Sequence, residues 1–165
     1  NSNVLYPILM ENYKWGNLNN DIYLDETNIR MTMNFRNNFS RLAQELINTK
    51  EYEKAKKALD YCMDIMPGDK VPLNYFVHPI IESYYKINAI TEANKLTSTL
   101  YDLYSKELNY YFSFSEKKIM GVSIEILRNL QFYNQLLEIA EKNNHPEKTE
   151  MQKKFQSFYQ NYLML

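Results

Sequence analysis

The residues that could carry out chemistry in this chain are few and widely spaced. His78 and Glu82 lie four positions apart, so a helix would place both side chains on one face, where they could supply two ligands of a metal site. His145 is the only other histidine, and a zinc site needs about three or four protein ligands. We therefore expect no metal site and no cofactor.

A catalytic nucleophile is no better supported. Cys62 is the only cysteine, which rules out an intramolecular disulfide and a cysteine zinc cluster. It occupies a small position in the helical pattern described below, where a buried thiol is usually inert. The three glycines, Gly16, Gly68 and Gly121, are too dispersed to form a phosphate-binding loop. The sequence therefore predicts no catalytic residue and no intrinsic enzyme activity.

The helices that would position these residues follow a repeat pattern. In RNNFSRLAQELINTKEYEKAKKALDYCMDIMPGD, residues 36–69, apolar and small side chains take positions of the tetratricopeptide pattern W-x2-L-G-x2-Y, A-x3-F and P. Small side chains let two antiparallel helices approach closely, and the proline ends the second helix because it lacks the backbone donor. The residues on the pattern are Phe39, Leu42, Ala43, Leu46, Ala55, Leu59 and Pro67.

A second copy of this pattern follows 38 residues later, where Ala93 aligns with Ala55. The standard unit has about 34 residues, and the additional residues fit in the linker PGDKVP. Terminal repeats are commonly atypical, so a divergent third hairpin would cap the array. We predict an all-α, tetratricopeptide-like right-handed stack of antiparallel helical hairpins (an α-α superhelix). Its repeats span about 36–69 and 74–107, its capping hairpin spans 115–165, and together they form one domain, 27–165.

Capping residues and prolines set the expected helix limits. Asp25 or Thr27 would cap the first repeat helix, Thr49 the second, and Ser113 with Glu116 would form a capping box. Pro146 suits a first helical position. The expected helices span about 27–48, 50–66, 75–87 with Pro79 in the first turns, 91–111, 115–142 with a bend at Gly121, and 146–165.

Residues 1–26 are expected to lie outside the repeats. The run NVLYPILMENY, residues 3–13, is apolar enough for a short helix with Pro7 in or near its first turn. The following segment, KWGNLNNDIYLDE, is rich in asparagine and reads as a loop. We expect this loop to be ordered and anchored on the helices by Trp15 and Tyr23.

The leading helices of such repeats line a concave groove, which selects the candidate binding residues. They are neutral donors and rings, without the basic residues that would clamp a peptide's terminal carboxylate. Such a surface suits an extended peptide backbone or a sugar equally, and a solvated helical face without a ligand is the alternative. The candidates are Asn37, Ser40, Gln44, Asn48, Tyr75, His78, Glu82 and Tyr85.

Composition narrows the possible partners. Nineteen basic and twenty acidic residues give a net charge of −1, which offers no electrostatic reason to expect nucleic acid. No apolar run approaches the roughly 20 residues that span a bilayer, and no signal peptide is visible. The chain does not begin with methionine, so it is expected to be a fragment of a longer protein. The fifteen tyrosines are expected to fill the interfaces between helices.

A second resemblance is carried by longer segments. KWGN, YLDETNIRMTMNFRNNFSRLA, ALDYCMDIMPGDKVPLNYF, PIIESYY and ELNYYFS resemble the C-terminal soluble region of a family of large bacterial multi-pass membrane proteins of unknown function. The membrane part of that family is similar to protein O-mannosyltransferases of the lipid-linked glycosyltransferase type. The resemblance covers residues from about 14 to about 133.

This resemblance implies that the chain is the periplasmic C-terminal tail of a membrane-anchored, glycosyltransferase-like protein. The family's catalytic residues would lie in the membrane part, so none falls on this sequence. The expected function is a non-catalytic protein-interaction or bracing domain, whose partner is a glycosylation acceptor or the parent's own membrane domain. The alternative is a free-standing tetratricopeptide adaptor that binds an extended peptide.

Overall fold

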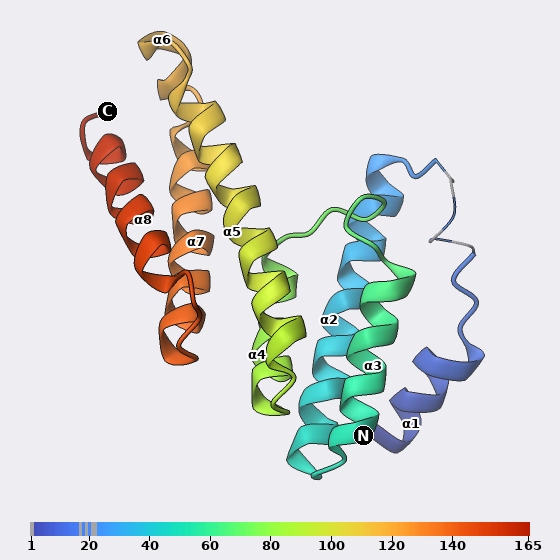
Figure 1. Cartoon of the computed structure of the whole chain (residues 1–165). Coiled ribbons are helices and arrows are strands. Elements are labelled where there is room, and N and C mark those ends of the chain that lie inside the picture. The colour runs from blue at the N-terminus through green and yellow to red at the C-terminus, as the bar shows by residue number, and fades with distance from the viewer. Residues whose placement is uncertain (1, 17, 19, 21–22) are drawn as a thin grey trace. The chain divides into compact units, whose positions relative to one another are not determined.

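The computed structural model describes residues 2–16, 18, 20 and 23–165, and all regular structure in them is helical. The predicted all-α class is therefore confirmed. The elements are α1 (Ser2–Pro7), the π-helix η1 (Ile8–Asn12), α2 (Glu26–Asn48), α3 (Tyr52–Ile65), the 3-10 helix η2 (Tyr75–Val77), α4 (His78–Lys86), α5 (Ile90–Phe112), α6 (Glu116–Met120), α7 (Ser123–Lys142) and α8 (Lys148–Leu163) (Figure 1). None of these helices combines the length and the apolar character needed to cross a membrane.

The chain divides into two compact units, residues 1–93 and 94–165, and the boundary lies inside α5. We call them unit 1 and unit 2 and describe each by itself. The boundary falls within the second expected repeat, 74–107. The expected division at residue 26 and the superhelical stack remain predictions.

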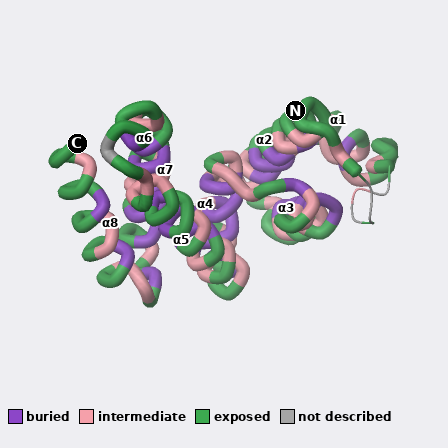
Figure 2. The backbone as a smooth tube through the Cα atoms, turned by 90° about the horizontal axis from the view of Figure 1, so that it is seen from above, coloured by how far each residue is buried: buried purple, intermediate pink, exposed green. Residues whose placement is uncertain are grey.

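Unit 1 is built around α2, which packs against α3 and α4. Figure 2 shows buried stretches on all three helices. Leu42, Ala43, Ala55 and Leu59 are fully buried, as the repeat pattern predicted, and Cys62 is buried beside them on α3. Tyr52, the first residue of α3, is exposed.

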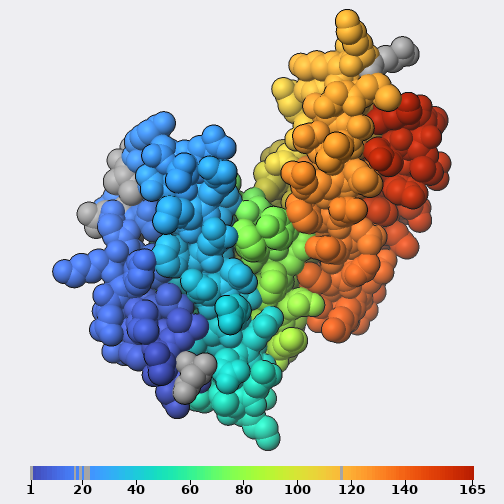
Figure 3. Space-filling model, turned by 180° about the vertical axis from the view of Figure 1, so that it is seen from behind, coloured from blue at the N-terminus to red at the C-terminus, as the bar shows by residue number. Residues whose placement is uncertain are grey.

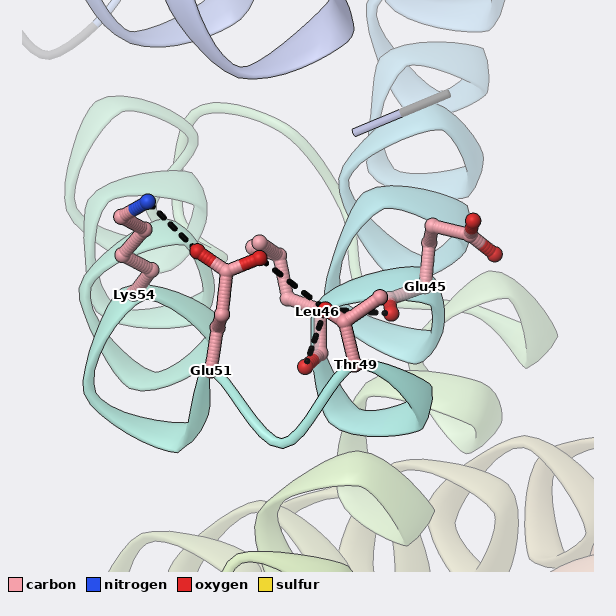
Figure 4. Close-up of polar contacts among 5 residues, drawn as sticks. All are labelled: Glu45, Leu46, Thr49, Glu51 and Lys54. Carbon is pink, nitrogen blue, oxygen red and sulfur yellow. Dashed lines mark hydrogen bonds and ion pairs between the residues drawn. The ribbon is translucent and has the colours of Figure 1, made fainter. Parts of the chain in front are cut away.

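Of the two expected helix caps in this region, Asp25 caps α2, whereas Thr49 does not cap α3. Asp25 caps α2, since its side chain accepts a hydrogen bond from the Asn28 N–H at 2.7 Å. Thr49 does not cap α3: its hydroxyl bonds back to the carbonyls of Glu45 and Leu46 at the end of α2. Its hydroxyl also contacts Glu51, the residue that precedes α3 (Figure 4). The threonine therefore closes the first helix rather than opening the second.

Arg36 holds the linker after α3 in place. Its side chain is fully buried, and it donates hydrogen bonds to the carbonyls of Met66 at 2.8 Å, Val71 at 2.6 Å and Pro72 at 2.6 Å. Burial lowers the pKa of this guanidinium to about 10. The repeat pattern did not single out Arg36, although this one side chain fixes the proline-rich linker on α2.

The N-terminal segment confirms one anchor and contradicts the other. Trp15 lies against the rings of Phe35 and Phe39, with centroids 5.2 and 5.5 Å away. Tyr23 is 93% exposed and anchors nothing, so that expectation was wrong. Pro7 ends α1 rather than lying in its first turn, and the chain continues as η1. Residues 17, 19, 21 and 22 of the expected ordered loop lie outside the described residues.

Three turns that each follow a helix share one geometry. In each, a single non-glycine residue has a positive φ of 55 to 63°, and the next N–H bonds to the carbonyl five residues back, which is the Schellman arrangement. The first two turns are offset by 38 residues, the same offset that the sequence predicted between repeats. The positive-φ residues are Lys50, Asn88 and Asn144, and the bonds join Glu51 to Leu46, Ala89 to Tyr84 and His145 to Ala140.

Unit 2 pairs α7 with α8 (Figure 3). The expected bend at Gly121 is a break, because α6 ends at Met120 and α7 begins only at Ser123. The capping box was also wrong: the Ser113 hydroxyl donates to the Tyr110 carbonyl at the end of α5, and the residue that precedes α6 is Ser115. Pro146 lies in the turn before α8 instead of opening the helix.

Candidate functional site

The predicted groove residues do not all reach the surface. Ser40, His78 and Tyr85 are buried, because α4 and η2 pack directly on α2 and cover this part of the unit 1 interior. The side chains of these three candidates contribute to packing in unit 1, and a role for them in binding stays a prediction. The remaining five are exposed or half-buried and stay candidates, namely Asn37, Gln44, Asn48, Tyr75 and Glu82.

Unit 1 contains the residues considered above as a nucleophile, Cys62, and as metal ligands, His78 and Glu82. Burial raises the pKa of the Cys62 thiol to about 12, so the thiolate that a nucleophile needs is strongly disfavoured at neutral pH. Over the described part of the chain, no three His, Cys, Asp or Glu side chains come together as a metal site. His78 is buried at the start of α4, while Glu82 one turn later is half-buried.

A polar cluster in unit 2 has the composition of a hydrolase triad. The Ser98 hydroxyl on α5 lies 3.5 Å from His145 Nε2 and donates a 2.5 Å hydrogen bond to the Glu147 carboxylate. His145 is buried in the turn between α7 and α8. Serine, histidine and glutamate are the residue types of a hydrolase catalytic triad, so the geometry decides whether the histidine could activate the serine as a nucleophile.

The hydrogen bonds show that this cluster is structural. His145 Nδ1 accepts from the Glu147 backbone N–H at 3.2 Å, so Nε2 carries the proton and points to the Asn94 carbonyl at 3.3 Å. A histidine in this tautomer cannot take a proton from Ser98 through Nε2. The cluster therefore joins α5 to the α7–α8 turn without the base that catalysis requires.

The neighbouring tyrosine contributes to the same junction. The Tyr101 hydroxyl lies 3.4 Å from Glu150 on α8, and Lys154 stands over the Tyr101 ring at 5.3 Å from its centroid. Burial, reinforced by Glu150, raises the pKa of Tyr101 to about 12. The hydroxyl therefore stays protonated at neutral pH and acts as a donor, not as a base.

An open groove of about 670 Å³ lies between α7 and α8 of unit 2. On α7, residues 127, 131, 134 and 138 lie three or four positions apart and so share one face. This face changes from apolar at its beginning to polar at its end. The groove is lined by Leu127, Leu130, Gln131, Asn134, Gln135, Glu138, Phe155 and Tyr159.

Two aromatic rings form the opposite wall. Phe155 and Tyr159 of α8 lie one turn apart with nearly parallel planes, at 15° and a centroid separation of 6.0 Å. Across the groove, the Asn134 amide donates to the Glu138 carboxylate at 2.7 Å. Rings beside side-chain amides offer both apolar contact and hydrogen bonds, a combination that is common at binding surfaces.

Sequence reasoning missed this groove. Met151 and Phe158 of α8 are buried, whereas Phe155 is half-buried and Tyr159 is exposed. The signal that could have found the groove is the row of amides on α7, because three amides along one helix face serve no apolar interior.

Comparison with known proteins adds no assignment: the chain matches no family model, no curated protein and no solved structure.

Proposed function

We propose that this chain is a non-catalytic module that binds polypeptide. The observation that carries the proposal is the α7–α8 groove, whose amides and rings are exposed or half-buried and whose floor is the buried Leu130. Side-chain amides pair with both the N–H and the C=O of a backbone, and rings supply contact area with few rotatable bonds. The three equivalent turns also support a repeat architecture, and stacked helical repeats commonly present extended binding surfaces.

We propose further that the module belongs to a membrane-anchored, glycosyltransferase-like parent and lies on its periplasmic side. The resemblance of residues 14–133 supports this placement. In that setting the module either presents acceptor polypeptide to the enzyme or braces the enzyme's soluble loops. Because each contact in an exposed groove contributes only about 0.5 to 1.5 kcal/mol net, tethering to the parent supplies much of the effective concentration. A free-standing tetratricopeptide adaptor is the alternative.

The test uses cells that produce the full-length parent with this module intact, deleted, or altered. Deletion should reduce glycosylation of the acceptor, measured by mass spectrometry of the acceptor peptides. If the groove presents the acceptor, Gln131→Ala with Tyr159→Ala should reproduce much of the loss. If the module only braces the enzyme, the same double variant should glycosylate normally while the deletion does not.

A matched pair in unit 1 tests the surface that the sequence predicted. Asn37→Ala with Tyr75→Ala changes two candidates that remain accessible, whereas Tyr85 is unsuitable because it is buried. If glycosylation of the acceptor falls only in this variant, the binding surface lies on α2 and η2 rather than in the α7–α8 groove. Undiminished glycosylation after deletion of the whole module would refute the accessory role.

A further inference from the structure

We infer that the α7–α8 groove selects an extended peptide in which an apolar side chain and a basic side chain lie four residues apart. This inference rests on the proposed function and adds the chemistry of the ligand. It follows from three features of the groove: its amides, its polarity from one end to the other, and its length.

The amides favour an extended ligand over a helical one. Gln131, Asn134 and Gln135 each carry a donor and an acceptor and follow one another along the groove. A helix already satisfies its own backbone N–H and C=O groups, so it has little use for a row of amides. An extended peptide leaves those groups unpaired and needs partners for them.

The two ends of the groove differ in chemistry. Leu127, which is 38% exposed, and the buried Leu130 provide an apolar seat at one end. Glu138 lies at the other end and is the one charged side chain among the eight lining residues. Lys142, one turn further along α7, is exposed and lies outside the lining. The lining therefore complements an apolar group at one end and a cation at the other.

The length of the groove sets the spacing. Leu127 and Glu138 are separated by a helical rise of about 16 Å at roughly 1.5 Å per residue. Residues i and i+4 of an extended chain point to the same side and lie about 13 Å apart. The flexible stem of a lysine covers the remaining few ångströms. A spacing of four residues thus satisfies both ends without bending the peptide.

The experiment is an NMR titration of the ¹⁵N-labelled 165-residue chain with capped heptapeptides. The probe is Gly-Leu-Ser-Ala-Ser-Lys-Gly, tested also in the reversed order because the groove does not fix the chain direction. The comparison peptide has glutamate in place of lysine. Resonances of α7 and α8 should shift, and the lysine peptide should bind at least about threefold more tightly at low salt, with the difference shrinking as salt is added.

Two isosteric variants locate the preference. Glu138→Gln should abolish the difference between the two peptides while keeping an acceptor for Asn134. Glu141→Gln is the matched control, because Glu141 is an exposed carboxylate on the same helix outside the lining. It should leave the preference intact. Equal responses of the two variants would show a general charge effect and overturn the inference.

The remaining outcomes separate this inference from the proposed function. Equal affinity for the lysine and glutamate peptides, with shifts confined to the groove, would overturn the inference and leave the peptide-binding function standing. No shift with any peptide at millimolar concentration, together with shifts caused by a neutral trisaccharide, would overturn both and identify the groove as a glycan site.

Discussion

The α2–α3 and α7–α8 helix pairs share one type of turn but differ in what lies between their helices. The first pair combines fully buried small side chains, Ala43, Ala55 and Cys62, with the aliphatic side chains of Leu42 and Leu59. The second pair packs rings: Tyr133 is fully buried, and Phe155 lies against it at a centroid distance of 5.5 Å. The Tyr133 hydroxyl donates a hydrogen bond to the Met151 carbonyl at 3.0 Å.

The open groove lies between α7 and α8, whereas the smaller hollow beside α2 and α3 is lined mostly by residues of α1. Small side chains let helix backbones approach until no ligand can enter, whereas rings fill the inner layer and leave the outer layer open. Leu130 forms the floor of that outer layer in α7, with exposed Leu127 and Tyr159 at its rim. The same turn geometry thus joins a closely packed helix pair in unit 1 and a pair with an open groove in unit 2.

The largest expected effect breaks the closed pair. Leu59→Asp places an unpaired carboxylate at a fully buried position, which costs several kcal/mol against a total stability of roughly 5 to 15 kcal/mol. Thermal unfolding followed by circular dichroism should show a large fall in Tm or the loss of the cooperative transition. Gln135→Asp in the groove should shift Tm little. A Leu59→Asp variant with the wild-type Tm would contradict the repeat assignment.

A smaller effect sharpens the contrast between closed and open interfaces. Ala55→Leu adds volume to an interface without space and should cost about 1 to 3 kcal/mol in the free energy of unfolding. Gln131→Leu adds apolar surface to an exposed wall and should change stability by no more than about 0.5 kcal/mol. Urea denaturation measures both. Similar costs for the two variants would show that α7 and α8 are as tightly packed as α2 and α3.

The smallest expected effect is a dependence of stability on pH that comes from Cys62 in unit 1. The folded pKa of Cys62 is raised to about 12 from an ordinary value of 9.0, so its contribution to stability is fully present below pH 9. It is lost as pH rises toward the folded pKa, because only the unfolded thiol then releases its proton. By pH 10 the loss reaches about 1.4 kcal/mol. Unit 2 contains no cysteine.

Urea denaturation between pH 8.5 and 10 checks this assignment. Cys62→Ala should flatten the pH dependence in that window, whatever its own effect on stability at neutral pH. The tyrosines with raised pKa values, such as Tyr84, are present in both proteins and cancel in the comparison. Parallel pH profiles for the wild type and the variant would show that Cys62 ionises as easily when folded as when unfolded.

The sequence predicted the helices well because their signals are local. The repeat spacing marked Leu42, Ala55 and Leu59 as interior, and all three are fully buried. The caps were less predictable, since Thr49 and Ser113 each lie between two helices and can bond to either one. Such a choice depends on backbone geometry that residue types alone do not specify.

The site was harder to predict than the fold. Ser40 and Tyr85 have the chemistry of a binding surface, but which face of a helix stays open depends on where its neighbours pack. Arg36 shows the same limit: an arginine in a helix is normally assigned to the surface, and only the path of the distant linker explains its burial. Long-range packing decides both cases.

The three equivalent turns have a consequence for the order of folding. Each reversal is set by bonds between residues only three to five positions apart, so each can form early at a small loss of chain entropy. The hydrogen bonds of Arg36 span 30 to 36 residues and can close only after α2 and α3 have met. The arginine therefore fixes the linker on α2 after the helix pair has assembled, and slowing this step should leave an assembled helix pair with a loose linker.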